Sequence, residues 1–372
     1  MVAALHPDHA SDVPVGMVAR SPGTMRASLD VFLRVSYAGD TRLCAMTSMQ
    51  VLMRGDTLVP TTAPELWIAD TDSLRPMIPT LQQRVRRKVL VIANGKGGVG
   101  KSSLASALAV VLTLVGKRVL LVEMDPQGNN AEDLGFIGTD LFDRGEGQAR
   151  AILDGTGLKP TGEARSRLWV VPGGEALEQV AEELYVQRRA ARASGDDTWL
   201  YMYAAAIAQV EQDYDVIILD VAPGSLVLQV QAMVAGDMVM VPSRSDESSR
   251  KGLRTVARRY VDALPHNPSL RLIGIVLFGI TSGGTRIAGE IRELLERDVR
   301  GAAPVFESGI RYVERAAVQC RRRGLVPHEL VQDPSLDAAH AKSLKGLASD
   351  YRALALELLT KIATLHQADA AS

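Results

Sequence analysis

Cysteine and histidine are both scarce in this chain. Its 372 residues include two cysteines, Cys44 and Cys320, which lie far apart and lack the close spacing of metal ligands. The six histidines form no H-x₃-H pair, so the sequence predicts no zinc site. Two distant thiols suit a reducing compartment, and we therefore expect a cytoplasmic protein.

Long apolar runs are also missing. No uninterrupted apolar stretch reaches the length of about 18 residues that a membrane-spanning helix needs. The N-terminus has no apolar segment of the kind that marks a signal peptide. We therefore expect no transmembrane segment.

The chain does contain a regular alternation of strand and helix patterns. Apolar residues make up 47% and charged residues 23%, as in an ordinary globular protein, and the formal net charge is −1. The strands read as continuous Val/Ile/Leu runs, which are typical of a parallel sheet covered on both faces. The sequence predicts an α/β fold with a doubly wound, mostly parallel sheet and helices on both faces, plus a small N-terminal extension.

A glycine-rich loop is the most informative motif. Residues 95–102 match the phosphate-binding pattern G-x-x-x-x-G-K-[ST], between an apolar strand over residues 88–93 and a helix over residues 104–115. Backbone N–H groups in such a loop bind phosphate, the side chain of Lys101 reaches the β- and γ-phosphates, and the Ser102 hydroxyl ligates Mg²⁺. The predicted nucleotide-binding residues are Gly95, Lys96, Gly97, Gly98, Val99, Gly100, Lys101, Ser102 and Ser103. The chain has no N-K-x-D guanine motif, so ATP is the expected nucleotide.

Two later strands end in acidic residues. An apolar strand over residues 119–124 runs into a turn that contains Asp125, and another over residues 215–220 ends at Asp220. Asp220 stands where nucleotide-binding proteins of this kind hold Mg²⁺ through water.

The loop and these strands resemble the ParA/MinD family of deviant Walker A ATPases, closest to the ParA partitioning branch. Residues 96–102 are similar to the family's deviant loop, and residues 123–129 to its D-x-D-P-Q-G-N segment, with Glu123 in place of the first Asp. The resemblance covers about residues 87–360 and implies a P-loop NTPase fold. It does not assign Glu123 a role.

The resemblance also implies roles for individual residues. Lys96 is expected to reach across an ATP sandwich dimer to the partner's phosphates, and Asp125 to orient the attacking water. The expected catalytic residues are Lys96, Lys101 and Asp125, and the expected Mg²⁺ site comprises Ser102, Asp125 and Asp220. Turnover is expected to be slow until the dimer has assembled.

Positive charge is concentrated late in the chain. Residues 250–323 contain 15 Lys and Arg against 7 Asp and Glu, a field that would attract phosphate backbone without reading its sequence. By resemblance, Arg286 and either Arg311 or Arg315 fall at the family's DNA-binding positions. The alternative is that individual basic residues lie on solvated helix faces with local ion pairs.

These features predict an ATPase that forms a homodimer on ATP and binds nonspecific DNA on the nucleoid. A ParB-like adaptor would stimulate its hydrolysis. A MinD-like ATPase at a membrane surface is an alternative, but residues 361–372 contain a single lysine and lack a strongly basic amphipathic pattern. A transcriptional repressor switched by ATP is another alternative, and it predicts sequence-specific footprints that residues 87–372 alone would lose.

The domain organisation is expected to be an extension over residues 1–86 and an ATPase domain over residues 87–372. Within the extension, residues 1–24 have the composition of a disordered segment. Residues 28–37 and 65–69 read as strands and residues 43–54 as a short helix, without a convincing helix-turn-helix. Residues 82–88 read as a basic, solvated link to the first strand of the ATPase domain.

Overall fold

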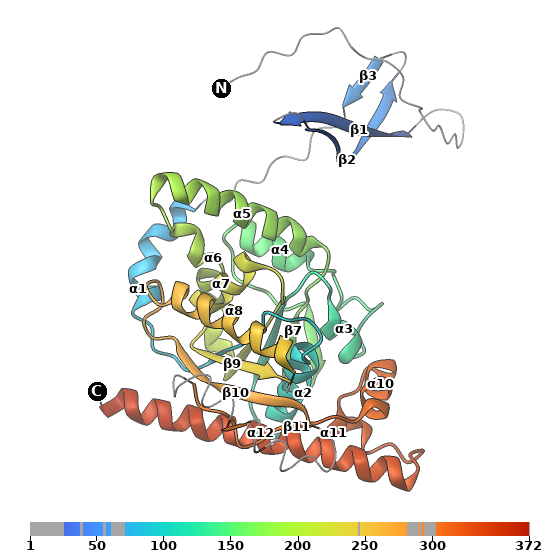
Figure 1. Cartoon of the computed structure of the whole chain (residues 1–372), viewed down its shortest axis with the longest axis vertical. Helices are drawn as coiled ribbons and strands as arrows, with labels where there is room; N and C mark the ends of the chain where they lie inside the picture. Colours follow the sequence, from blue (N-terminus) through green and yellow to red (C-terminus); the bar gives the residue numbers. More distant parts are fainter. Residues whose placement is uncertain are drawn as a thin grey trace. The chain divides into compact units, whose positions relative to one another are not determined.

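The computed structural model describes residues 26–37, 40–54, 57–60, 71–244, 246–280, 289, 292–293 and 303–371. The chain divides into two compact units, Met1–Trp67 and Ile68–Ser372. Figure 1 labels their helices and strands. The second unit starts before the predicted domain boundary at residue 87, because two short helices, η1 (Asp72–Met77) and α1 (Ile78–Gln82), pack on its later elements. The functional division at residues 86 and 87 stays a prediction.

The described part of the first unit is an antiparallel sheet. It has the strand order β1 (Arg26–Tyr37), β2 (Asp40–Arg54) and β3 (Thr57–Pro60). The expected strand over residues 28–37 is confirmed, whereas the expected helix over residues 43–54 is wrong. That segment pairs with β1 on one side and β3 on the other, so its backbone groups bond between strands and not within a helix. The strand predicted over residues 65–69 lies outside the described residues.

The second unit is built on a mixed sheet with one antiparallel edge. Among the described residues its eight strands have the order β11-β10-β9-β4-β8-β5-β7-β6, and only the β6–β7 pair is antiparallel. The strands are β4 (Val89–Ile92), β5 (Val119–Met124), β6 (Gly162–Arg165), β7 (Leu168–Val171), β8 (Val216–Val221), β9 (Met238–Ser243), β10 (Arg271–Ile280) and β11 (Ile310–Arg311). The predicted fold class is confirmed.

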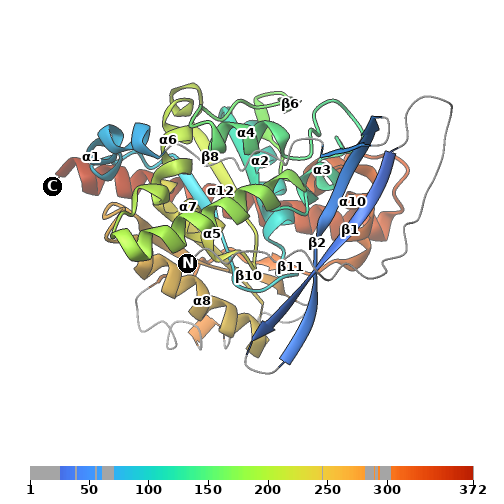
Figure 2. The ribbon, with the colours of Figure 1, turned by 90° about the horizontal axis from the view of Figure 1, so that it is seen from above.

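Helices cover both faces of this sheet. They are α2 (Lys101–Leu114), α3 (Asn129–Asp133), α4 (Glu146–Leu153), α5 (Ala176–Ser194), α6 (Met202–Ala208), α7 (Leu226–Ala235), α8 (Glu247–Ala263), α10 (Glu314–Arg323), α11 (Pro327–Leu330) and α12 (Ala338–Ala371). Two short 3₁₀ helices, η2 (Thr198–Tyr201) and η3 (Glu211–Asp213), connect some of them. Figure 1 shows α5, α6 and α7 on one side of β9 and β10 and α12 on the other, and Figure 2 shows these layers turned by 90°.

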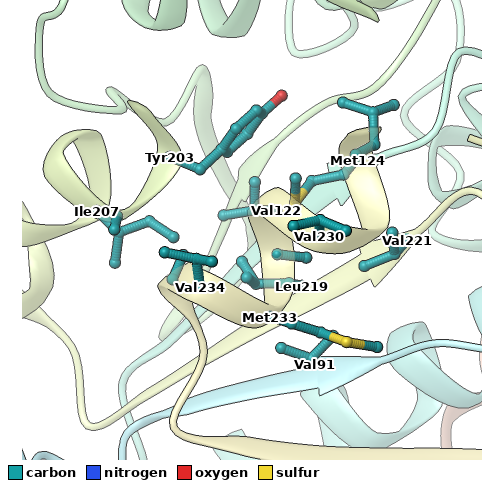
Figure 3. Packing of buried hydrophobic residues seen from close by; sticks show 14 of the residues in the cluster. Val91, Val122, Met124, Tyr203, Ile207, Leu219, Val221, Val230, Met233 and Val234 are labelled. Atoms are coloured by element: carbon teal, nitrogen blue, oxygen red, sulfur yellow. The ribbon is translucent and has the colours of Figure 1, made fainter. Parts of the chain in front are cut away.

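The side chains of the central strands alternate between two hydrophobic cores. In β4, Val89 and Val91 belong to one core and Leu90 and Ile92 to the other. The first core contains residues of α4 to α8, and Figure 3 shows Val91 among its neighbours. The second contains residues of α2, α10, α11 and α12. This double burial explains why the strands are apolar along their whole length.

The arginine side chains of the basic link before β4 are largely buried, so the expectation of a solvated segment is wrong for them, whereas Gln83 and Val85 of the link are exposed. Arg84 and Arg86 both form ion pairs with Glu211, and all three side chains are at most 13% exposed. Arg87 has a side chain only 1% exposed and pairs with Asp369 near the end of α12. The basic residues are neutralised by acids that are distant in sequence.

Candidate functional site

A cavity of about 850 Å³ lies at the end of the sheet to which β4 and β5 run. The loop between β4 and α2 supplies a polar wall with Gly97, Gly98, Gly100, Lys101, Ser102 and Ser103. Residues of β10, of the segment after β11 and of the stretch from α10 to α12 supply an apolar wall that includes Phe278, Val313, Val326 and Leu347. Such a volume, with one polar and one apolar end, suits a small molecule that carries phosphate and a flat ring. Its position follows the rule for open α/β sheets, whose ligands bind beyond the carboxyl ends of the strands.

Glycine is required at two positions of the loop. Gly98 has a φ of +73° and Gly100 a φ of +88°, in the left-handed region. A Cβ atom on Gly100 would overlap the ring of Phe278. Helix α2 starts directly after Gly100, three residues before the predicted start, and its first N–H groups therefore face the cavity end of the loop.

The two lysines of the loop lie in different environments. Lys101 is buried at 6% exposure, lines the cavity, and points its Nζ to within 3.5 Å of the Lys96 carbonyl oxygen. Burial lowers the pKa of Lys101, and the charges of Asp220 and Asp125 oppose that effect. The side chain of Lys96 points away and forms a 2.8 Å ion pair with Asp246, just before α8.

Two acidic residues reach the same region from the ends of β5 and β8. Asp220 is fully buried; burial raises its pKa to about 6, against the opposing effects of the Ser102 hydroxyl and Lys101. Its Oδ2 accepts a hydrogen bond, whereas its Oδ1 is buried without a hydrogen-bond partner among the described residues. Asp125 lines the cavity, and its Oδ1 accepts the backbone N–H of Gln127 at 3.0 Å.

These groups fit a magnesium ion. An unsatisfied carboxylate oxygen beside a serine hydroxyl matches the hard oxygen ligands that Mg²⁺ selects. Magnesium is commonly bound by one or two protein oxygens with substrate phosphates and water completing its shell. Ser102 and Asp220 would hold the ion or its water, and the bound ion would neutralise charge on the transferring phosphoryl group.

Known proteins are similar to this chain in sequence and in fold. A family model described as an AAA domain matches residues 87–271. The chain is 29% identical to the chromosome-partitioning ATPase Soj of Thermus thermophilus over 284 residues, 76% of this chain and 98% of that protein. It is 34% identical to the chromosome partitioning protein ParA of Caulobacter vibrioides over 198 residues, 51% of this chain and 68% of that protein. The chain belongs to the ParA/MinD family of ATPases.

A solved structure agrees with this assignment. Cobyrinic acid a,c-diamide synthase from Mycobacterium smegmatis, with bound ADP and magnesium, is 27% identical with a TM-score of 0.50, over 64% of this chain and 92% of that one. The nucleotide in that structure agrees with a P-loop ATPase, and the Soj and ParA relatives place this chain in the ParA partitioning branch. In the part of the chain that the structure describes, no helix has both the length and the apolar character needed to cross a bilayer.

Sequence reasoning missed a buried polar network beneath the site of this ParA-like ATPase. The carboxylate of Glu123 accepts the backbone N–H groups of Asn130 at 3.0 Å and Gly173 at 3.3 Å. Gln148 donates to the Glu123 and Pro172 carbonyl oxygens. Burial raises the pKa of Glu123 well above its ordinary value, and the nearby charge of Asp220 adds to the effect. Glu123 thus ties together the loops that follow β5 and β7.

Two of the three arginines predicted to bind DNA lie among the described residues, and both of these form ion pairs with acidic residues. Arg286 lies outside the described residues. Arg311 forms two hydrogen bonds with the Asp350 carboxylate, at 2.6 and 2.8 Å, and this contact raises the pKa of the guanidinium. Arg315 forms a 2.8 Å ion pair with Asp337. Both arginines remain accessible, but each already has an acidic partner, as in the alternative of local ion pairs. Their role in DNA binding is a prediction that these contacts leave untested.

Proposed function

We propose that this protein is a ParA-like partitioning ATPase that dimerises on ATP, binds DNA without sequence preference as a dimer, and is reset by a ParB-like partner that stimulates hydrolysis. Its nucleotide is ATP, with Mg²⁺ as cofactor. The related Soj and ParA proteins are named for chromosome partitioning, and that role is proposed here for this chain. Through its DNA contacts the dimer would associate with the nucleoid.

The contrast between the two lysines carries this proposal. Lys101 is buried against its own phosphate site, whereas Lys96 is 35% exposed at the side chain and points out of that site toward Asp246. Because the side chain of Lys96 points away from the phosphate site of its own subunit, it is available to contact the phosphates bound by a second subunit. Lys96 would neutralise charge on the phosphates of the partner subunit, as an arginine finger does in other phosphoryl-transfer enzymes.

The remaining residues of the site support slow hydrolysis. The loop N–H groups and Lys101 would hold the phosphates, and Asp220 with Ser102 would hold Mg²⁺. Asp125 would orient the attacking water from the edge of the cavity, where its Oδ1 is already fixed by Gln127. Because Lys96 has to come from a second subunit, an isolated protomer lacks one part of the phosphoryl-transfer machinery. Slow turnover is therefore expected before the dimer assembles.

The deciding experiment measures DNA binding and dimerisation with ATP, with ADP and without nucleotide. We expect an ATP-dependent dimer that binds random-sequence DNA and releases it at high salt. In Asp125→Ala, the dimer and its DNA binding should persist while hydrolysis is lost, because binding contacts remain and the water is no longer oriented. Asp140→Ala changes an exposed acid nearby and serves as the matched control.

Two results would contradict the proposal. ATP hydrolysis by Asp125→Ala at the wild-type rate would remove the assigned role of that carboxylate. DNA binding that is equal with ATP, with ADP and without nucleotide would remove the switch.

A further inference from the structure

One face of α8 carries a row of basic side chains. Lys251, Arg254 and Arg258 are all exposed and are spaced by three and four residues, so they lie on one side of the helix. The opposite side of the helix buries Gly252 and Val256 against the protein. Within the described residues, none of the three cations lies within ion-pair distance of an acid.

The three basic residues of α8 differ in their ion pairing from Arg311 and Arg315, which were predicted from the sequence to bind DNA. Arg311 and Arg315 would each have to exchange Asp350 or Asp337 for a phosphate, so the net gain from a DNA contact is small. Among the described residues, the three α8 cations have no ion pair to lose when they approach phosphate. Lys251 and Arg258 are seven positions apart, which is about 10 Å along the helix or about three base-pair steps of DNA.

The row also lies on a helix that contacts the phosphate loop. A Cβ atom on Gly95 would come within 2.7 Å of the Thr255 side chain, and Asp246, next to the start of α8, binds Lys96. Engagement of Lys96 by a partner subunit would break that ion pair at the first turn of the helix. Helix α8 therefore contacts the phosphate loop directly, and a change at Lys96 on nucleotide binding would act on the start of this helix.

We propose that Lys251, Arg254 and Arg258 form the main DNA-contact surface of the ATP-bound dimer, an inference that rests on the proposed function. The partner is the phosphate backbone of DNA, recognised by charge and not by sequence. Two protomers would bring two such rows to one DNA segment, which makes affinity steeply dependent on dimerisation and on salt.

The test replaces all three residues with glutamine in the full-length protein and measures DNA affinity against salt concentration with ATP. Each phosphate contact contributes about 0.9 to the slope of log K against log salt, so the slope should fall by about 2.7 per protomer. The matched control, Arg188→Gln with Arg189→Gln and Arg192→Gln on α5, removes the same charge from another helix and should leave the slope unchanged. Arg258→Gln alone, farthest of the three along α8 from the loop contacts, should lower the slope by about 0.9 per protomer.

The outcomes separate the two proposals. An unchanged slope in the triple variant, with the wild-type protein binding DNA on ATP, overturns the α8 surface and leaves the proposed function standing. Absence of ATP-dependent DNA binding in the wild-type protein overturns both. A lower slope in the α5 control, equal to that of the triple variant, shows that total charge and not the α8 row decides binding.

Asn130, beneath the phosphate site, is fully buried and forms hydrogen bonds to residues of α2, β5 and β8. Its Nδ2 donates to Asp220 Oδ2 at 3.0 Å, its Oδ1 accepts from the Ser106 hydroxyl at 2.6 Å, and its backbone N–H donates to Glu123 at 3.0 Å. Asp220 therefore has one oxygen occupied and one free.

We infer that Asn130 is a positioning residue for Asp220. By holding Oδ2, it fixes the rotation of the carboxylate and leaves Oδ1 as the oxygen available to Mg²⁺ or its water. Ser106 on α2 holds the amide in turn, which fixes its orientation relative to the phosphate loop. Groups of this kind around a metal ligand commonly alter metal affinity by about 10- to 100-fold when they are removed.

The test measures binding of a fluorescent ATP analogue as Mg²⁺ is titrated. Asn130→Ala should raise the Mg²⁺ concentration at half-maximal binding about tenfold, whereas Mg²⁺-free ADP binding should stay within about twofold of the wild type. Ser106→Ala leaves the contact with Asp220 in place and should give a smaller shift. A shift below twofold in Asn130→Ala, or an equal loss of Mg²⁺-free ADP binding, would show that Asn130 has a structural role only.

Discussion

At the scale of single residues, the carboxyl group of Asp220 is fully buried, and among the described residues its Oδ1 has no hydrogen-bond partner. Burial raises its pKa from 3.8 to about 6, so the folded state without Mg²⁺ holds its proton more tightly than the unfolded state does. The stability contributed by this proton is complete below about pH 4 and is lost as the pH rises through about 6. At neutral pH the ionised carboxylate of Asp220 therefore lowers the free energy of unfolding of the metal-free protein.

We predict that Asp220→Asn stabilises the metal-free protein at pH 7.5 by up to about 3 kcal/mol, since two pKa units correspond to about that free energy. The same change should abolish Mg²⁺-dependent nucleotide binding. Urea unfolding at pH 7.5 and at pH 4.5 measures the difference, which should shrink at the lower pH. A wild-type protein as stable as the variant at pH 7.5 would contradict the prediction.

The ion pair between Lys96 and Asp246 gives a second prediction at this scale. The pair is partly exposed, at 35% and 43% of the two side chains, so it is worth less than about 1 kcal/mol. If Lys96 leaves Asp246 to enter a partner's site, Asp246→Asn should strengthen ATP-driven dimerisation by up to about fivefold for each of the two ion pairs that the dimer breaks. Sedimentation in an Asp125→Ala background measures this without interference from hydrolysis.

Lys96→Ala, also in the Asp125→Ala background, is expected to have the opposite effect on dimerisation. It should bind ATP with wild-type affinity and remain monomeric, because its own phosphate site keeps Lys101 while the partner's site loses a cation. Dimerisation of Lys96→Ala at wild-type strength would contradict the assignment of Lys96 to the partner's phosphates.

At the scale of elements, the link before β4 is held to the ATPase unit by buried charge. Glu211 in η3 pairs with both Arg84 and Arg86, and Arg86 also contacts Asp237. We predict that Glu211→Gln destabilises the unit by about 3–5 kcal/mol, because it leaves two buried guanidinium groups without their shared partner. Nucleotide affinity of the folded fraction should stay unchanged, since η3 does not line the cavity.

The matched control removes an acid from an exposed ion pair. Arg144 and Glu175 are 67% and 73% exposed, so Glu175→Gln should cost less than about 1 kcal/mol. Urea unfolding of both variants gives the comparison. Equal effects would show that burial of the Glu211 pairs does not matter for stability.

At the scale of the whole molecule, the two hydrophobic cores and the described walls of the nucleotide cavity belong to the unit Ile68–Ser372. We predict that residues 68–372 expressed alone fold with the full-length unfolding midpoint and keep ATP-dependent, nonspecific DNA binding. Calorimetry and DNA titration measure both properties. Sequence-specific footprints that appear only with the full chain would instead favour a repressor that uses residues 1–67.

The amino-acid sequence by itself determined the parts of this protein that depend on neighbouring residues. The phosphate loop, the strand before it and the helix after it could be predicted because glycine conformation, apolar runs and helix starts are local properties. The apolar strands also determined the fold class, since strands apolar throughout need cover on both faces. Lys101 and Asp220 were found in the same way, from patterns within short segments, whereas Lys96 and Asp125 were assigned from the resemblance of short segments to the ParA/MinD family.

Tertiary structure alone decided which charged and polar groups became partners. Asn130 and Asp220 are 90 residues apart, and Arg87 and Asp369 are 282 apart, so no local pattern predicts that they meet. For the same reason the basic link was misjudged as solvated, and residues 43–54 were misjudged as a helix when their bonding partners are β1 and β3. Charge counts locate a basic region, but whether an arginine is free for DNA depends on the acids that the fold places beside it.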